Sequence, residues 1–142
     1  MDIINKKEKV AVCSRSFSMN IVLRDELLSR YQNVTFNDEG IKLSGDSLIK
    51  FLKGHDKAIT ALEVIDDAVL SHLPELKVIG KYGVGLDMID MDAMTKYGVR
   101  LGWLKGVNKR SVSELVVSSA IALLHQTIFA NAEVRRGEWY QV

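Results

Sequence analysis

Lys77–Met94 reads KVIGKYGVGLDMIDMDAM, and this stretch contains one full unit of the fold predicted for the chain. An apolar run that ends in Gly80 leads into a turn that holds Gly83 and Gly85. Asp90 follows at a position expected of a helix N-cap. A strand, a turn and a helix in this order are the building unit of an α/β fold. The glycines also raise the question of whether the turn binds a ligand.

The first hundred residues repeat this alternation of short apolar runs and segments of helical period. We predict strands at Val10–Ser14, Asn33–Phe36, Lys57–Leu62, Leu76–Gly80 and Val99–Trp103. We predict helices at Ser18–Tyr31, Asp46–Lys53, Asp66–Leu73 and Asp90–Gly98. The connections are too short for anything but local crossovers, so the sheet is predicted to be parallel. The predicted fold class is α/β, a flavodoxin-like three-layer domain with a parallel five-stranded sheet, followed by a long linking helix.

Composition narrows the classes of partner. The 142 residues include 19 basic and 18 acidic side chains, so no clustered basic face for nucleic acid or an anionic membrane surface is expected. The amino-terminal MDIINKKEK has no apolar core and does not resemble a signal peptide. As a helix, the apolar run Leu115–Leu124 would span roughly half of a bilayer's hydrocarbon thickness. We therefore expect a cytoplasmic protein with no membrane partner.

The last forty residues have a different pattern. Ser111 and Glu114 carry the sequence signature of a capping box, which predicts a helix from Val112 to about Arg136, ended by Gly137. Apolar residues cover more than one face of this helix. A helix that is apolar nearly all round must be buried on more than one side. The sequence therefore requires a covering surface from a second domain, a partner chain or both.

The glycine turn has three interpretations. In the dinucleotide-binding fingerprint the third glycine position holds Met88 here, and no acidic residue lies about twenty positions further on, which disfavours it. A purely structural turn explains one glycine better than three. At the carboxyl end of a parallel strand, where ligands of open sheets bind, the amides of Val84 and Gly85 are unshielded by side chains. Such a turn can bind a small anion, and a carboxylate is the expected one.

Two blocks of this sequence resemble a known family. LKVIGKYGVGLDMIDMDAMTKYGVRLGWLKGVNKRSVSELVVSSAIALL, followed by ANAEVRRGEWYQV, is similar to the D-isomer-specific 2-hydroxyacid dehydrogenases, which include phosphoglycerate dehydrogenase. The matching positions of the motifs are Gly80, Lys81, Gly83, Gly85, Asp87, Ile89, Asp90, Asn108, Ser111, Val112 and Glu114. Met88 replaces the usual Asn, and Ser113 the usual Ala. The strong match covers about Leu76–Val142, and the first 75 residues agree only in pattern.

The resemblance implies a substrate domain over residues 1–104, and over residues 105–142 a hinge and long helix leading toward a cofactor domain absent from this chain. It implies that the amides of Val84 and Gly85, with Gly83 in the same turn, hold the carboxylate of a small 2-hydroxy or 2-oxo acid. Asn108 would lie near the substrate and the nicotinamide of NAD, and Ser111 would face the cofactor.

The family's catalytic Arg, Glu and His lie further downstream, so no catalytic residue is expected in this chain. The resemblance then implies hydride transfer only by the complete enzyme, and neither activity nor tight NAD binding by this chain alone.

Two basic residues complete the candidate site. Arg15 follows the first predicted strand at the same sheet edge as the glycine turn and could select an anionic substrate tail, although a surface arginine in a loop is the simpler interpretation. Lys81 could add positive potential to the cleft. Cys13 is interpreted as a small buried side chain rather than a reactive thiol. The alternative to a dehydrogenase fragment is a non-catalytic binding or assembly module, a homodimer through the long helix.

Overall fold

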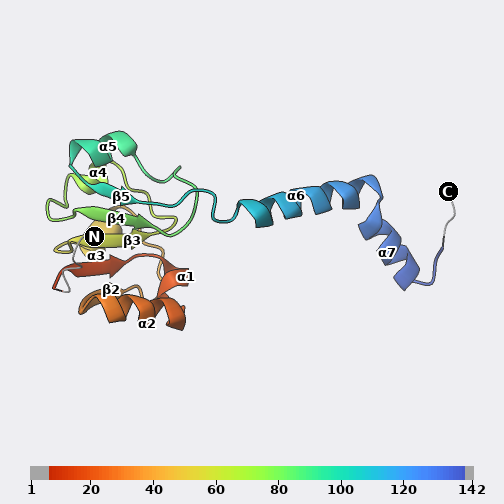
Figure 1. Ribbon diagram of the computed structural model, residues 1–142, viewed down its shortest axis with the longest axis horizontal. Helices are drawn as coiled ribbons and strands as arrows, with labels where there is room; N and C mark the ends of the chain where they lie inside the picture. Colours follow the sequence, from red (N-terminus) through yellow and green to blue (C-terminus); the bar gives the residue numbers. More distant parts are fainter. Residues whose placement is uncertain (1–6, 140–142) are drawn as a thin grey trace. The chain divides into compact units, whose positions relative to one another are not determined.

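A computed structural model of the chain describes residues 7–139, which form two compact units divided between Lys105 and Gly106 (Figure 1). The strands of the first unit are β1 (Lys9–Val12), β2 (Asn33–Phe36), β3 (Lys57–Thr60), β4 (Val78–Lys81) and β5 (Arg100–Gly102). Its helices are α1 (Arg15–Ser18), α2 (Ile21–Arg30), α3 (Gly45–Leu52), α4 (Asp67–Leu70) and α5 (Met91–Lys96). The second unit contains α6 (Lys109–Leu124) and α7 (Thr127–Arg135).

The five strands form one parallel sheet in the order β2-β1-β3-β4-β5. This is the flavodoxin-like strand order, and it confirms the predicted fold class. All five strands lie within one or two residues of their predicted bounds. Because the strands are parallel, all their carboxyl ends lie at the same edge of the sheet. The loops after β1, β3 and β4 therefore lie near one another.

The two faces of the sheet have separate apolar cores. Along β1, Ala11 packs with α3, α4 and α5, whereas Val10 and Val12 pack with Leu27 of α2. Successive side chains of a strand point to opposite faces, which explains this division. Figure 1 shows α4 and α5 on one side of the sheet and α1 and α2 on the other. The resulting three layers hold the loops at the carboxyl edge.

Asp56 connects strands at the opposite, amino-terminal edge. Its carboxylate accepts hydrogen bonds from the backbone nitrogen of Lys9 (3.0 Å) and from Nζ of Lys77 (2.8 Å). These bonds stabilise the ionised form, so the pKa of Asp56 lies below its ordinary value, chiefly because of the bond from Lys77. One side chain thus links the starts of β1 and β4.

The predicted helix Ser18–Tyr31 corresponds to α2, and the single-turn helix α1 before it was not predicted. α1 is a single turn, and Asn20 then begins α2 by accepting a hydrogen bond from the amide of Leu23 (3.1 Å). The side chain of an N-cap residue satisfies an amide that has no partner inside the helix. The prediction therefore began the helix three residues too early, and Asn20 marks its true start.

The second unit corrects two predictions. The single helix predicted from Val112 to Arg136 is broken into α6 and α7, which meet at an angle of 62°, and Gln126 between them has a left-handed φ of 48°. The capping box is also wrong, because α6 begins at Lys109, ahead of Ser111. Glu114 instead accepts a hydrogen bond from Nε of Arg110 (2.7 Å), one helical turn earlier.

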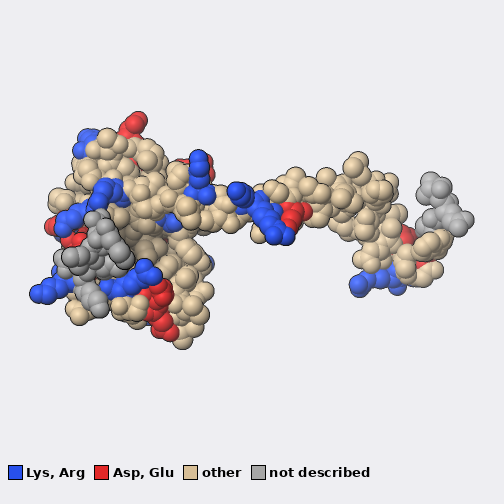
Figure 2. Space-filling view, viewed as in Figure 1, with Lys and Arg blue, Asp and Glu red and all other residues tan. Residues whose placement is uncertain are grey.

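α6 has no buried residue. Residues 115–132 contain no charged side chain, and Figure 2 shows this uncharged surface between charged groups near the start of α6 and the end of α7. Within residues 7–139, no single helix is long and apolar enough to cross a membrane; only the bent pair of α6 and α7 together reaches that length and composition. The apolar surface of α6 has no covering partner within the described unit.

Candidate functional site

The loop after β4 contains two unused backbone donors. Within residues 7–139, neither the amide of Val84 nor that of Gly85 donates a hydrogen bond to a protein group. The loop itself is fixed on both sides: the amide of Tyr82 donates to the carbonyl oxygen of Thr60 (2.7 Å), and Nε1 of Trp103 donates to the carbonyl oxygen of Val84 (3.1 Å). Two adjacent N–H groups without a protein partner are able to bind a small anion.

Glycine is required in this loop for two different reasons. Gly83 has a φ of +140°, a conformation that L residues rarely adopt. At Gly85 the backbone conformation is ordinary, but an added Cβ would lie 3.2 Å from Oδ2 of Asp87, closer than a comfortable contact. Side chains at these two positions would strain the loop or crowd it. Both residues therefore keep the amides open at the sheet edge.

Lys81 brings positive charge to the same loop. Its ammonium group donates a hydrogen bond to the carbonyl oxygen of Ala61, in the loop after β3. An added Cβ at Gly83 would lie 3.8 Å from Nζ of Lys81, so the ammonium group lies beside the backbone of the glycine loop. This position lets the charge attract an anion bound at the amides.

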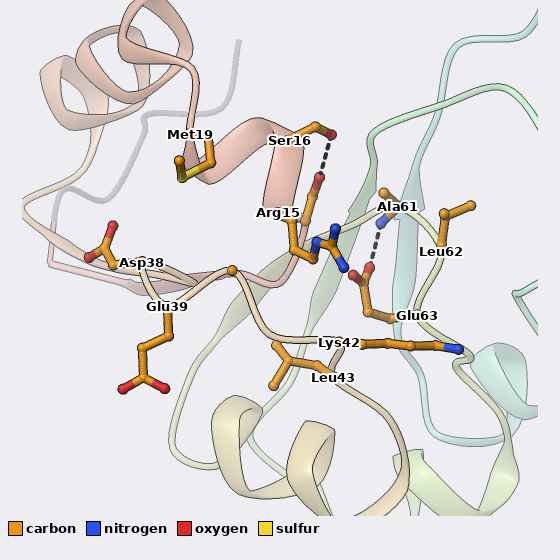
Figure 3. Close-up of a pocket in the computed structure, with 12 residues that line it drawn as sticks. Arg15, Ser16, Met19, Asp38, Glu39, Lys42, Leu43, Ala61, Leu62 and Glu63 are labelled. Atoms are coloured by element: carbon orange, nitrogen blue, oxygen red, sulfur yellow. Dashed lines mark hydrogen bonds between the residues drawn. The ribbon is translucent and has the colours of Figure 1, made fainter.

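A cavity of about 630 Å³ opens at the same sheet edge, between α1, the loop after β2 and the loop after β3 (Figure 3). Arg15, Lys42, Glu39 and Glu63 are among the charged side chains that line it, and Met19 and Leu62 are among the apolar ones. Ligands of open parallel sheets bind in crevices outside the carboxyl ends of the strands. The cavity lies at such a crevice.

Glu63 is the buried acid of this cavity. The residue is only 9% exposed, and its Oε2 accepts a hydrogen bond from the amide of Ala61 (2.6 Å). Figure 3 shows the guanidinium group of Arg15 and the carboxylate of Glu63 directed toward each other. Sequence reasoning missed Glu63. The available signal was its position three residues after the end of β3, at the edge where polar side chains meet ligands.

Two contacts join the cavity to the glycine loop. The rings of Phe17 and Tyr82 meet edge to face with centroids 5.3 Å apart, which places α1 against the loop after β4. On the other side, Lys81 holds the carbonyl oxygen of Ala61, whose residue lines the cavity. The cavity and the two free amides are therefore neighbouring parts of one sheet edge.

The predicted site residues fall into two groups. Arg15, Lys81 and the glycine loop lie together at the carboxyl edge of the first unit. Asn108 and Ser111 lie in the second unit, where Asn108 is the N-cap of α6 and makes no side-chain capping hydrogen bond. Within residues 7–139, no group of three or more His, Cys, Asp or Glu is placed to hold a metal ion.

Cys13 is fully buried at the end of β1. Burial raises the pKa of its thiol, and the negative charge of Glu63 raises it further. A thiol is nucleophilic only as the thiolate, so this cysteine is a packing residue rather than a reactive one.

The fold and the glycine loop define an α/β domain, and comparison with known proteins assigns its family. Residues 10–137 match the family described as D-isomer specific 2-hydroxyacid dehydrogenase, catalytic domain. The chain therefore belongs to this family. A glyoxylate reductase from Thermococcus litoralis is 31% identical over 93 residues, which are 65% of this chain and 28% of that protein.

Solved structures have the same fold. The PH0520 protein from Pyrococcus horikoshii OT3 is 28% identical, with a TM-score of 0.75 over 95% of this chain and 39% of that chain. The NAD⁺-bound 3-phosphoglycerate dehydrogenase of Entamoeba histolytica is 20% identical, with a TM-score of 0.61 over 82% of this chain and 39% of that one. The chain thus spans about a third of the relatives that it matches.

Proposed function

We propose that this chain is the amino-terminal substrate-domain part of an NAD-dependent D-2-hydroxyacid dehydrogenase. The amides of Val84 and Gly85 bind the carboxylate of a small 2-hydroxy or 2-oxo acid. The observation that carries the proposal is the pair of unpaired N–H groups beside an ammonium group, that of Lys81. Hydrogen bonds from amides to a carboxylate are charge-assisted and about twice as strong as neutral ones.

In the complete enzyme, NAD exchanges a hydride with C2 of the acid. Membership of the 2-hydroxyacid dehydrogenase family supports this chemistry, and the NAD⁺-bound relative with the same fold supports the cofactor. Asn108 helps to orient the reacting centre, and Ser111 lies on the cofactor side at the start of α6. We assign the catalytic groups to the remainder of the complete enzyme, since this chain corresponds to only about a third of its relatives' length.

Amide chemical shifts test the carboxylate site. In a ¹⁵N-labelled sample titrated with glycolate, we expect the signals of Val84 and Gly85 to move most, with a Kd of about 1–10 mM, because only two hydrogen bonds and one nearby charge act. Glycolamide, which has the same shape and no charge, should move them far less. Equal shifts with both compounds, or none with glycolate, would contradict the proposal.

The absence of turnover is tested separately. The chain alone, mixed with NADH and a panel of 2-oxo acids, should leave the absorbance of NADH at its blank rate. The contradicting result would be oxidation of NADH by the purified chain that a Gly83→Ala variant does not show. It would mean that this chain itself carries catalytic groups.

A non-catalytic dimeric module is the alternative, and the exposed apolar surface of α6 favours it. Both proposals are compatible with a dimer, because a dehydrogenase subunit can also pair with a second copy through this helix. An uncovered apolar surface of this extent associates readily in water. The dimer is therefore proposed for either function, and only carboxylate binding distinguishes them.

A further inference from the structure

We propose that the cavity beside the glycine loop receives the tail of the bound acid and selects an uncharged tail with several hydroxyl groups, as in an aldonic acid. This inference rests on the proposed carboxylate site. The Phe17–Tyr82 contact and the Lys81–Ala61 hydrogen bond place the cavity next to the two free amides. An acid held by its carboxylate there can extend its carbon chain into the cavity.

The size of the cavity excludes a two-carbon acid as its full occupant. Pockets that hold small molecules enclose about 300–1,000 Å³, and this one encloses about 630 Å³. Glycolate or glyoxylate would leave most of that volume to water. A chain of five or six carbons makes use of the apolar side chains of Met19, Leu43 and Leu62 as well as the polar ones.

The charges that line the cavity are balanced. Asp38 forms an ion pair with Arg24 (2.5 Å), so its charge is already compensated. The other charged residues of the lining are Arg15, Lys42, Glu39 and Glu63, two positive and two negative, and no ion pair links any of these four to a residue of the described chain. The charges of the lining cancel in number, so net charge gives no preference for a tail of either sign.

Hydrogen-bonding capacity decides the class of tail instead. One oxygen of Glu63 accepts from Ala61, and the other carries no protein hydrogen bond in the described residues. The guanidinium group of Arg15 has donors directed at the same space (Figure 3). A hydroxyl group both donates and accepts, so each hydroxyl can bond to the acid and to the guanidinium. An alkyl tail would remove water from both groups without replacing the hydrogen bonds that they lose.

Five acids that share the 2-hydroxycarboxylate group test the selection by shift titration: glycolate, 2-hydroxyhexanoate, gluconate, glucarate and 6-amino-2-hydroxyhexanoate. Gluconate should bind at least fivefold more tightly than each of the others. The alkyl acid 2-hydroxyhexanoate, the dianion glucarate and the amine 6-amino-2-hydroxyhexanoate have the same chain length as gluconate. Differences in affinity among these four therefore report the chemistry of the tail. If any of those three binds as tightly as gluconate, the selection of a hydroxylated tail is wrong.

Variants assign the effect to the cavity. Glu63→Gln keeps an acceptor for Ala61 and should weaken gluconate binding about fivefold while glycolate binding is unchanged. Arg15→Met, at an exposed position, should do the same. Glu75→Gln, an exposed acid elsewhere, is the matched control and should change neither. Gluconate binding that is unchanged in both cavity variants would overturn the inference.

The two proposals fail in different ways. If glycolate does not move the amides of Val84 and Gly85, the carboxylate site is wrong, and the tail selection falls with it. If glycolate and gluconate both move these amides but have equal affinities, the carboxylate site stands and the tail selection alone is overturned.

Discussion

At the scale of single residues, the site depends on backbone groups rather than on side-chain chemistry. Gly83 adopts a conformation that side chains disfavour, and Gly85 leaves no room for a methyl group without moving Asp87. The amides of Val84 and Gly85 are available to a ligand because no carbonyl oxygen of the described chain accepts a hydrogen bond from them. If the amides bind the substrate as proposed, binding is sensitive to changes that leave every charged group in place.

Replacing Gly83 by alanine tests this dependence. We expect Gly83→Ala to lose about 1–2 kcal/mol of folding stability and to weaken glycolate binding at least tenfold, because the loop must leave its φ of +140°. Chemical denaturation and shift titration measure the two effects. Gly98→Ala also replaces a glycine of positive φ, with open space around it, and should lower stability without affecting glycolate. If Gly83→Ala and Gly98→Ala bind glycolate equally well, the glycine loop does not form the carboxylate site.

The thiol of Cys13 should be unreactive in the folded chain. Burial and the nearby charge of Glu63 raise its pKa, so the thiolate is scarce at neutral pH. We expect a thiol reagent such as 5,5′-dithiobis(2-nitrobenzoate) to react only at the rate of unfolding and promptly in denaturant. Fast labelling of the native chain would show that this cysteine is accessible.

At the scale of secondary-structure elements, the sheet was predictable and the helix break was not. The apolar run at Val10–Ser14 located the central strand β1, which is buried on both faces. The edge strands β2 and β5 are only partly buried and were located by their place in the alternation of strands and helices. The break at Gln126 has no such signal, since neither proline nor glycine interrupts the apolar pattern from Leu115 to Ala132. There a non-glycine residue adopts a left-handed conformation that local sequence does not favour.

Asp56 makes the junction of strands β1 and β4 dependent on pH. Its pKa is lowered in the folded chain, so its stabilisation is complete above about pH 4 and is lost as the pH falls through the folded pKa. We expect Asp56→Asn to lower the free energy of unfolding by about 1 kcal/mol at pH 7, and the difference from wild type to shrink below about pH 4. Urea unfolding at a series of pH values measures this.

Asp25→Asn is the control for this experiment, since Asp25 is an exposed acid on α2. It should change stability by less than about 0.5 kcal/mol at any pH. A destabilisation by Asp56→Asn that persists at pH 2 would indicate packing rather than charge.

At the scale of the whole molecule, each unit leaves a surface that is suited to binding another molecule. The first unit has a complete core and an open carboxyl edge that offers two amides and a lined cavity. The second unit has an apolar helix with no buried residue. The sequence predicted both surfaces, from the glycine turn and from the all-round apolar pattern. It did not predict Glu63, because its position after β3 marks the sheet edge, but only tertiary packing decides which side chain there lines the cavity.

The exposed surface of α6 should drive association of two copies. Leu123 is 73% exposed, and we expect Leu123→Lys to shift the chain from dimer toward monomer in sedimentation equilibrium. Val22 of α2 is similarly exposed at 71%, so Val22→Lys adds the same charge without touching α6 and should leave the dimer intact. A wild-type chain that is a stable monomer at all concentrations would remove the case for this interface.

The carboxylate site itself is tested most directly by a crystal structure of the chain with glycolate. We predict carboxylate oxygens about 2.7–3.2 Å from the backbone nitrogens of Val84 and Gly85, with Nζ of Lys81 close by. A carboxylate seated on Arg15 alone, or those two nitrogens bonded to protein carbonyl groups in the crystal, would contradict the account.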